Sequence, residues 1–345
     1  MTCLVFFVGP RFIGSETGGE SGEKELKSHE GTLSQKVNSN KGAVTLREVN
    51  TRVFREFGYE IARLTVPIVS LRMLAEPSCN KTFADWLKTS RKPQPEAAPR
   101  EIPDGAGMGF LLNNYTALEY VFSDDKNSTY STELDGNWVR LAELIFWTPE
   151  QLANLEEGSE GVSLHNAMKH YRLDGMRGLI IGSIQPWVEV YALQNGAAHV
   201  LTVHAHPPKI QEGFKDRIAS IDPAELAATW LNHTLDFAAS FSMIGHAGLG
   251  RFGDPIDMIG DLREVRKIRC LLKPGGLLFL GAHVGVDMIV FNLHRVYGPI
   301  RMAMMIQGFE LIAAFRESNP EPVDLNDSSH LFSANKQITL VLRKL

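Results

Sequence analysis

The chain has 345 residues, of which 44% are hydrophobic and 22% are charged, and its formal net charge is −5. These values are ordinary for a folded protein with one large domain, or with one domain and a substantial N-terminal addition. The acidic balance and the scattered Lys and Arg residues exclude an overall basic field. We therefore expect no nucleic-acid partner and no attraction to anionic lipid.

The beginning of the chain carries no clear targeting signal. Its apolar run, residues 3–8, is far too short to span a bilayer, and we expect no membrane span. Five N-x-S/T sequons are present where roughly two are expected by chance, at Asn80, Asn114, Asn127, Asn232 and Asn326. The missing signal favours the cytoplasm and the excess of sequons favours the secretory pathway, so both compartments stay open.

The three cysteines, Cys3, Cys79 and Cys270, do not predict a disulfide framework, and their spacing is wrong for a zinc site. Cys270 lies within a predicted helix, so we expect a small buried core residue there.

The N-terminal part is predicted to hold little regular structure. Residues 1–44 are expected to form a disordered tail, because Gly, Ser, Glu and Lys dominate residues 14–43. The spacing of apolar residues over 45–75 predicts a helix, the proline-rich stretch 90–107 is a connector, and loops are expected over 108–135. Residues 45–135 thus form a helical and Pro-rich extension.

Residues 136–345 are predicted to form an α/β domain. Short helices come first, with Thr148 as an N-cap and Pro149 in the first turn of one of them. Apolar strands then alternate with helices, and the strands are expected at 177–183, 199–204, 217–221, 236–244, 277–283, 309–317 and 336–345. This alternation predicts a doubly wound, mostly parallel sheet, closed by a C-terminal antiparallel hairpin.

The alternation, together with "LLKPGGLLFL" before the fifth strand, resembles the class I S-adenosylmethionine-dependent methyltransferase fold. A narrower resemblance rests on "GSIQPWVEVYALQNGAAHVLTV", "HAGLGRFGDPIDMIGDLREV" and "FNLHRVYGPIRM", which are similar to segments of the nematode-expanded domain of unknown function 268 family. The resemblance implies a methyltransferase-like core with S-adenosylmethionine as its cofactor, and it implies no particular substrate.

The predicted cofactor turn departs from the methyltransferase pattern. Gly182 is its only glycine, Ser183 follows, and Trp187 is expected to add bulk where the cofactor would lie. His204 ends the second strand, where an acidic residue usually holds the ribose hydroxyls. Glu189, one turn into the following helix, is interpreted as an exposed charge. Gly182, Ser183 and His204 remain the candidate cofactor-binding residues.

A second candidate site follows the fourth strand, in "SMIGHAGLGRFGDPIDMIGD". Its glycines allow positive φ angles around His246, Arg251 and Asp254, which are the candidate catalytic residues. His246 is the candidate base. The structural alternative is that Asp254 or Asp257 caps the next helix and pairs with Arg251.

A third segment, after the fifth strand, contains Asn292, His294 and Arg295 as candidate substrate-binding residues. His283 lies in the same segment, but no third ligand at metal spacing accompanies these histidines, and no metal is expected. Nucleophile-elbow and P-loop motifs are absent from the sequence.

Two functions follow. The first is methyl transfer from S-adenosylmethionine to a polar acceptor, either a glycan or a small molecule. The second is a catalytically inactive binding or regulatory module that has kept the methyltransferase fold and has a degenerate cofactor turn. A dinucleotide-dependent dehydrogenase is disfavoured because G-x-G-x-x-G is missing. The sequence leaves the oligomeric state open.

Overall fold

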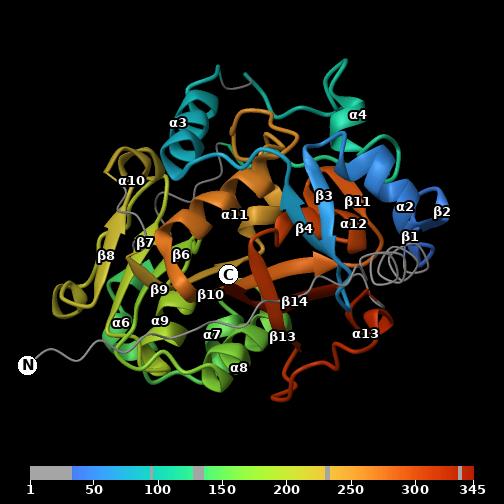
Figure 1. The fold of residues 1–345 in the computed structure, drawn as a ribbon. Helices are drawn as coiled ribbons and strands as arrows, with labels where there is room; N and C mark the ends of the chain where they lie inside the picture. Colours follow the sequence, from blue (N-terminus) through green and yellow to red (C-terminus); the bar gives the residue numbers. More distant parts are fainter. Residues whose placement is uncertain (1–32, 94–95, 127–135, 230–233, 333–335) are drawn as a thin grey trace, which may run out of the picture.

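The computed structural model describes residues 33–93, 96–126, 136–229, 234–332 and 336–345. A seven-stranded sheet lies at its centre, in the order β13-β14-β10-β9-β6-β7-β8 (Figure 1). The strands are β6 (Arg177–Ile181), β7 (His199–Val203), β8 (Ile218–Ile221), β9 (Leu235–Phe241), β10 (Leu272–Val284), β13 (Phe309–Arg316) and β14 (Lys336–Lys344).

The directions of the strands confirm the predicted architecture. β8, β7, β6, β9 and β10 run parallel, whereas β14 is antiparallel to both β10 and β13. The predicted doubly wound sheet with its closing antiparallel hairpin is therefore present. The fourth strand ends at Phe241, three residues earlier than predicted, because the chain turns at Ser242 (φ 64°) into a 3-10 turn, η4 (Met243–His246).

Helices cover both faces of this sheet. On one face lie α10 (Pro223–Thr229), α11 (Gly260–Leu271) and α12 (Pro299–Met305); on the other lie α6 (Leu141–Leu144), α7 (Pro149–Ala153), α8 (Val162–His170) and α9 (Trp187–Gln194) (Figure 1). Neighbouring strand residues divide between the two apolar cores: Leu179 packs with the first set and Ile180 with the second. Burial on both sides explains why the central strands read as continuous apolar runs.

Local sequence explains where several helices begin and how the chain reverses. Thr148 and Gln151 form a reciprocal capping box at α7, as the Thr148–Pro149 pair predicted. The turn predicted before residue 277 lies within β10, where the pairing with β9 shifts register between Leu272 and Leu277. Gly275 adopts φ 76° there, which a residue with a side chain rarely adopts.

The N-terminal part is more regular than the sequence predicted. β1 (Lys36–Ser39) and β2 (Gly42–Thr45) form an antiparallel pair inside the segment expected to be disordered, while residues 1–32 lie outside the described residues. The helix predicted over 45–75 is wrong beyond Phe54. A short helix α2 (Leu46–Val49) and a π-helical turn η1 (Asn50–Phe54) are followed by the antiparallel strands β3 (Tyr59–Arg63) and β4 (Ser70–Met73).

The loop prediction for 108–135 also needs correction. α4 (Gly107–Phe110) and β5 (Ala117–Val121) lie there, and residues 127–135 lie outside the described part. β5 pairs in parallel with β11 (Met288–Asn292), which pairs in turn with β12 (His294–Val296). The sequence around β5 shows no alternation that predicts a strand, because β5 is stabilised by a partner about 170 residues away.

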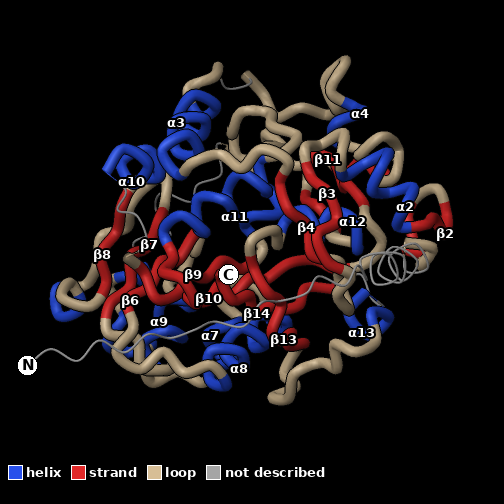
Figure 2. Tube along the Cα trace, in the orientation of Figure 1, coloured by secondary structure: helices blue, strands red, loops and turns tan. Residues whose placement is uncertain are grey.

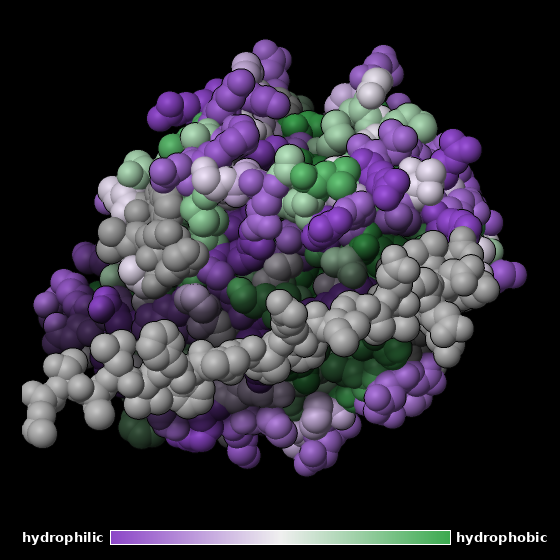
Figure 3. Space-filling model, in the orientation of Figure 1, coloured by the Kyte–Doolittle hydropathy of each residue, from purple (hydrophilic) through white to green (hydrophobic). Residues whose placement is uncertain are grey.

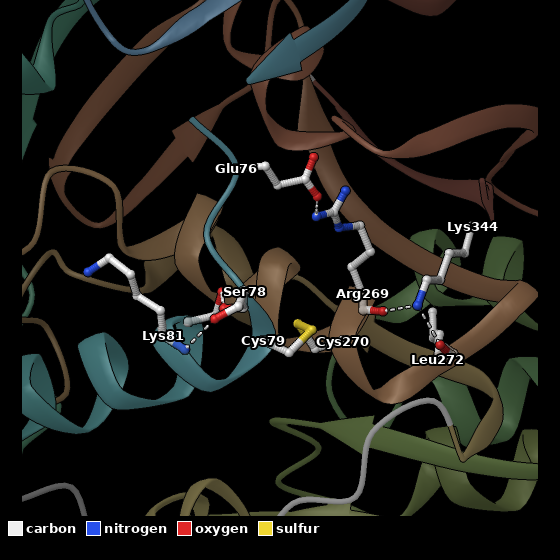
Figure 4. The surroundings of a disulfide bond; sticks show 9 residues. Glu76, Ser78, Cys79, Lys81, Arg269, Cys270, Leu272 and Lys344 are labelled. Carbon is white, nitrogen blue, oxygen red and sulfur yellow. Dashed lines mark hydrogen bonds and ion pairs between the residues drawn. A yellow bond between two sulfur atoms is a disulfide. The ribbon is translucent and has the colours of Figure 1, made fainter. Parts of the chain in front are cut away.

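A disulfide joins the extension to the core. Cys79 at the start of α3 (Cys79–Ser90) is bonded to Cys270 in α11, and the two Cα atoms are 5.6 Å apart (Figure 4). Glu76 and Arg269 form an ion pair beside it. The prediction of an unpaired core cysteine at position 270 is therefore wrong. The pairing spans 191 residues and leaves no local sequence signal.

The outline of the molecule around α3 is mainly polar. Figure 2 shows α3 and α10 near one another, with α11 running from there across the same side of the sheet, and Figure 3 shows hydrophilic side chains along the outline near α3, with hydrophobic ones in smaller areas toward the middle of that face. Among the described residues, we find no helix with the length and apolar character needed to cross a membrane.

Candidate functional site

The larger of two adjoining cavities opens at the carboxyl ends of the parallel strands and has a volume of about 820 Å³. Gly182 follows β6, His204 follows β7, Asp222 follows β8 and Met243 follows β9, and all four line this cavity. The chain order along the sheet reverses between β6 and β9, and open α/β sheets bind ligands at such a reversal.

Helix α3 supplies an outer wall through Trp86, Thr89 and Ser90. The Trp86 indole donates a hydrogen bond of 2.6 Å to Glu264 in α11, and the Lys267 ammonium lies 3.6 Å from the centre of the Trp86 ring. Lys267 also pairs with Glu264 at 2.8 Å. These contacts and the disulfide hold the extension against the core, so the cavity is built from both parts of the chain.

Gly182 shapes the turn after β6. Its φ is 82°, and a Cβ atom there would lie 2.2 Å from Cγ of Met243, so only glycine fits. Ser183, the next candidate, does not reach the cavity with its hydroxyl, which donates toward the Gln185 carbonyl (2.5 Å) and Glu189 Oε2 (2.9 Å). Gly182 thus offers backbone and space, and Ser183 holds the turn.

Trp187 does not block the turn. Its side chain is 1% exposed and packs edge-to-face on Tyr191 and Phe241, on the face of the sheet that α6 to α9 cover. It lines neither cavity. The expectation that its bulk occupies the cofactor position is wrong, because the first turn of α9 directs the ring into the core.

Glu189 is also placed differently from the prediction. It is fully buried rather than exposed, and accepts hydrogen bonds from Ser183 (2.9 Å) and Thr202 (2.6 Å). Burial raises the pKa of Glu189 to about 7, although both hydroxyl donors lower it. This carboxyl ties the turn after β6 to the neighbouring strand β7.

His204 lines the larger cavity directly after β7. Its Nδ1 is engaged with the backbone of His206, at 2.9 Å from the nitrogen and 2.8 Å from the oxygen. Burial lowers the pKa of His204, which favours the neutral ring. A neutral imidazole with one nitrogen engaged can make one hydrogen bond to a ligand.

The glycine-rich loop after η4 is held by a residue of the loop itself and by a residue of the N-terminal extension. Asp254 accepts hydrogen bonds from the backbone of Gly248 (2.6 Å) and Phe252 (3.4 Å), so it shapes the loop and also lines the larger cavity. Arg251 pairs with Asp125 of the extension. The expected pairing of Arg251 with Asp254 or Asp257 is therefore absent, and Asp257 pairs with Arg263 at 2.8 Å.

A smaller cavity of about 460 Å³ adjoins the first. Five residues line both: Gly182, Ile184, Met243, His246 and Phe252. The other walls of the smaller cavity carry polar and charged side chains, namely Glu156, Glu157, Gln185, Ser242, Arg251, His283 and His294.

His246 stands at the boundary of the two cavities. Its Nδ1 lies 2.5 Å from the Leu293 carbonyl, which can only accept, so Nδ1 carries the hydrogen and Nε2 has the lone pair. Ser242 Oγ lies 3.4 Å from Nε2. Burial and the positive charge of Arg251 together lower the pKa of His246 to about 3, although the hydrogen bond to the Leu293 carbonyl raises it. His246 is thus a neutral hydrogen-bond acceptor.

A polar network lines the smaller cavity behind His246. Gln337 in β14 places its Nε2 within 3.1 to 3.2 Å of Glu157 Oε2, Ser242 Oγ and His283 Nε2. The rings of His283 and His294 stack with their centres 4.2 Å apart. Burial raises the pKa of Glu157 to about 7 and lowers that of His283 to about 4. Glu157 therefore exchanges a proton near neutral pH.

Two candidates from the third segment line neither cavity. Asn292 is buried and pairs with the backbone of Ser123 through two hydrogen bonds of 2.9 Å. Arg295 is buried and donates to the carbonyls of Gly245 (3.3 Å) and Ala247 (2.6 Å), which fixes the glycine-rich loop. Of this segment, His294 alone among the three candidates lies at a cavity wall.

Below that loop lies a buried ionic network. Arg301 makes two hydrogen bonds to Asp261 at 2.7 and 2.8 Å, and the Tyr297 hydroxyl donates to the same carboxylate at 3.0 Å. Burial alone would raise the pKa of Asp261, but Arg295 and Arg301 outweigh it and hold that pKa at about 2. Within the described residues, no group of three or more His, Cys, Asp or Glu could hold a metal ion.

Sequence reasoning missed Glu157, Gln337 and Trp86. Glu157 and Gln337 lie 180 residues apart, and no spacing rule links them. Glu189 did leave a signal: its helix is apolar all round, which is typical of a fully buried helix.

Comparison with known proteins gives one family. The profile described as "Caenorhabditis protein of unknown function, DUF268" matches residues 175–345. No curated protein matches the chain significantly.

Several solved structures are similar in fold. The 1,6-didemethyltoxoflavin-N1-methyltransferase of Burkholderia thailandensis, with bound S-adenosylhomocysteine, is 13% identical with a TM-score of 0.40, and the alignment covers 72% of this chain and 94% of that one. For the N-methyltransferase NodS of Bradyrhizobium japonicum the identity is 11%, the TM-score 0.36 and the coverage 60% and 98%. For the [4+2]-cyclase SpnF the values are 13%, 0.36, 62% and 96%.

The assignment of the fold rests on the order and directions of the seven strands, and the assignment of the family rests on the profile match. Residues 175–345 of the chain belong to the DUF268 family, and the core has the class I methyltransferase-like fold.

Proposed function

We propose that the protein binds S-adenosylmethionine in the larger cavity and transfers its methyl group to a small polar or glycan acceptor held in the smaller one. The observation that carries this proposal is the pair of adjoining cavities, which share a wall at Gly182, Met243 and His246. Transfer between two bound molecules needs such an arrangement, because alignment of the reacting atoms supplies most of the acceleration.

The residues of the larger cavity fit the cofactor. The space beside Gly182 is one that a Cβ atom would fill, so backbone can approach a ligand closely there. His204 can make a hydrogen bond to a ribose hydroxyl from the end of β7. S-adenosylmethionine supplies a methyl group on positively charged sulfur.

The residues of the smaller cavity divide two tasks in this proposal. Nε2 of His246 accepts a hydrogen bond from a second hydroxyl or N–H of the acceptor, next to the group that is methylated, and so orients the acceptor. Glu157, with a pKa of about 7, takes the proton that the acceptor loses. His246 was the base predicted from sequence, but a ring with a pKa of about 3 is a weak base. Gln337 positions Glu157, Ser242 and His283, and Arg251 and His294 contribute polar walls.

Asp254, Asn292 and Arg295 have supporting parts in this proposal. Each binds backbone: Asp254, which also lines the larger cavity, and Arg295 hold the glycine-rich loop, and Asn292 holds the segment after β5. They keep the site in shape and do not touch the acceptor.

The second candidate is a catalytically inactive binding module. The low pKa of His246 and the imidazole of His204 in place of an acidic residue favour it.

The test uses the full chain in two stages. Calorimetric titration with millimolar S-adenosylmethionine and S-adenosylhomocysteine, with NADH as the control ligand, measures cofactor binding. Release of S-adenosylhomocysteine is then measured with pools of small hydroxyl, amine and glycan acceptors. Binding with turnover that Glu157→Gln abolishes supports methyl transfer. Binding without turnover in any pool contradicts methyl transfer to these classes of acceptor. No binding of either ligand supports the inactive module, whose cofactor turn no longer functions.

A further inference from the structure

The loop between α4 and β5 exposes an asparagine with an unusual neighbour. Asn114 is exposed and adopts φ 68°, and it begins the sequon Asn114-Tyr115-Thr116. Thr116 is 2% exposed, and its Oγ1 has no hydrogen-bond partner. A buried hydroxyl without a partner lowers stability, so packing gives no reason for threonine here where valine has the same shape. The sequon does give a reason, because it requires a hydroxyl at this position.

The disulfide is an independent observation that points the same way. Cys79 and Cys270 are joined across 191 residues. Disulfides persist in oxidising compartments and are rare where thiols are kept reduced. N-linked glycans are added in the same oxidising compartment, where the chain is still unfolded and Thr116 is accessible.

We propose that Asn114 accepts an N-linked glycan in a chain that matures in an oxidising compartment, where Cys79 and Cys270 form their disulfide. Asn326, which is exposed next to α13 (Ser328–Phe332), is a second acceptor. Neither asparagine lines a cavity, so glycans at both leave the proposed site open. The proposal does not depend on the proposed methyl transfer.

The chemistry balances with two co-reactants. The donor is a lipid-linked oligosaccharide diphosphate: the Asn114 amide nitrogen bonds to the anomeric carbon, the bond from that carbon to the diphosphate breaks, and the nitrogen loses one proton. For the disulfide, two thiols lose two protons and two electrons to a protein disulfide, which is reduced to a dithiol.

The test expresses the full chain, with its own N-terminus, in animal cells and measures its mobility before and after removal of N-glycans by glycosidase. A matched pair isolates Asn114: Thr116→Val removes the sequon and keeps the buried shape, whereas Thr116→Ser keeps the sequon. We expect Thr116→Val to lose one glycan step and Thr116→Ser to retain it. Ser328→Ala and Ser328→Thr form the corresponding pair for Asn326.

Thiol counting checks the compartment separately. In Cys3→Ser protein, alkylation before reduction should add no label, and alkylation after reduction should add two. An unglycosylated chain with two free thiols overturns the proposal. A disulfide without a glycan on Asn114 overturns the acceptor site, and a glycan with two free thiols overturns the disulfide. Thermal unfolding of Thr116→Val shows that a missing glycan does not come from a misfolded chain, since this variant should unfold no earlier than Thr116→Ser.

Discussion

Gly182 and Met243 meet across the wall between the two cavities so closely that a Cβ on Gly182 would lie 2.2 Å from Met243 Cγ. These residues follow β6 and β9, the two strands between which the sheet reverses its chain order. The space available to a ligand at this point is therefore set by the absence of one carbon atom.

Replacing Gly182 with alanine should abolish cofactor binding. The new methyl group displaces Met243 into the cavity, and φ 82° costs a residue with a side chain about 1 to 2 kcal/mol. We expect the rise in midpoint temperature caused by S-adenosylhomocysteine, a few degrees in the parent, to disappear. Gly213→Ala is the control, because a Cβ there meets nothing within 4 Å. A ligand-induced rise that survives in Gly182→Ala would place the cofactor elsewhere.

Glu189→Gln should change how stability depends on pH. The folded chain keeps the proton of Glu189 up to a pKa of about 7, against 4.5 for an ordinary glutamate, so it binds more protons than the unfolded chain between these values. This contribution is complete below pH 4.5 and is lost as the pH rises through 7. The gap corresponds to roughly 3 kcal/mol.

Denaturant unfolding of parent and Glu189→Gln from pH 4.5 to 8 measures the effect. The unfolding free energy of the parent should fall relative to that of Glu189→Gln as the pH rises. Glu225→Gln, which changes an exposed carboxylate on α10, should show the same pH dependence of stability as the parent. Parallel curves for all three proteins would show that Glu189 is ionised in the folded state at neutral pH.

Asp261→Asn should be among the most destabilising single substitutions in the chain. It removes the negative charge between the buried guanidinium groups of Arg295 and Arg301 and leaves both uncompensated. Loss of one partner in a buried ion pair costs about 3 to 5 kcal/mol. Asp174→Asn, at an exposed pair with Arg172, should leave the midpoint of denaturant unfolding nearly unchanged. Equal effects of the two substitutions would contradict this account of the network.

The double variant Cys79→Ser/Cys270→Ser should be less stable than the oxidised parent by about 2 to 5 kcal/mol, because the disulfide closes a long loop in the unfolded chain. Adding reductant should lower the stability of the parent to that of the variant and leave the variant unaffected. A parent that does not respond to reductant would show that the two thiols are not joined.

The sequence predicted those strands and helices that are marked by short apolar runs between turn residues. β6 and β7 are apolar runs between turn residues, and each lies where it was predicted. The apolar run predicted at 277–283 lies within β10, which begins five residues earlier at Leu272. The helix after Pro186 was predicted too, but a helix with apolar residues on every side has no periodicity that tells which way Trp187 and Glu189 point. Both side chains were therefore misplaced while their helix was right.

The candidate site was only half visible in the sequence, since it depends on contacts over long separations. Gly182, His204 and His246 follow strands, and the rule that strand ends meet at one edge brings them together. Asp125 with Arg251 and Trp86 with Glu264 join the extension to the core across 126 and 178 residues. Burial, rather than residue type, is also the main cause of the shifted pKa values of Glu157 and His246.

Helix α3 lies outside the part of the chain that matches the family, but it contributes to the larger cavity. The stretch that recurs in the family begins at residue 175, yet Trp86, Asp125 and Lys126 line the larger cavity, and Trp138 lies in the core below the sheet. A protein begun at residue 175 would keep the strands and lose a wall of the pocket together with half of the disulfide. The part of the chain that matches the family and the part that builds the larger cavity are thus of different lengths.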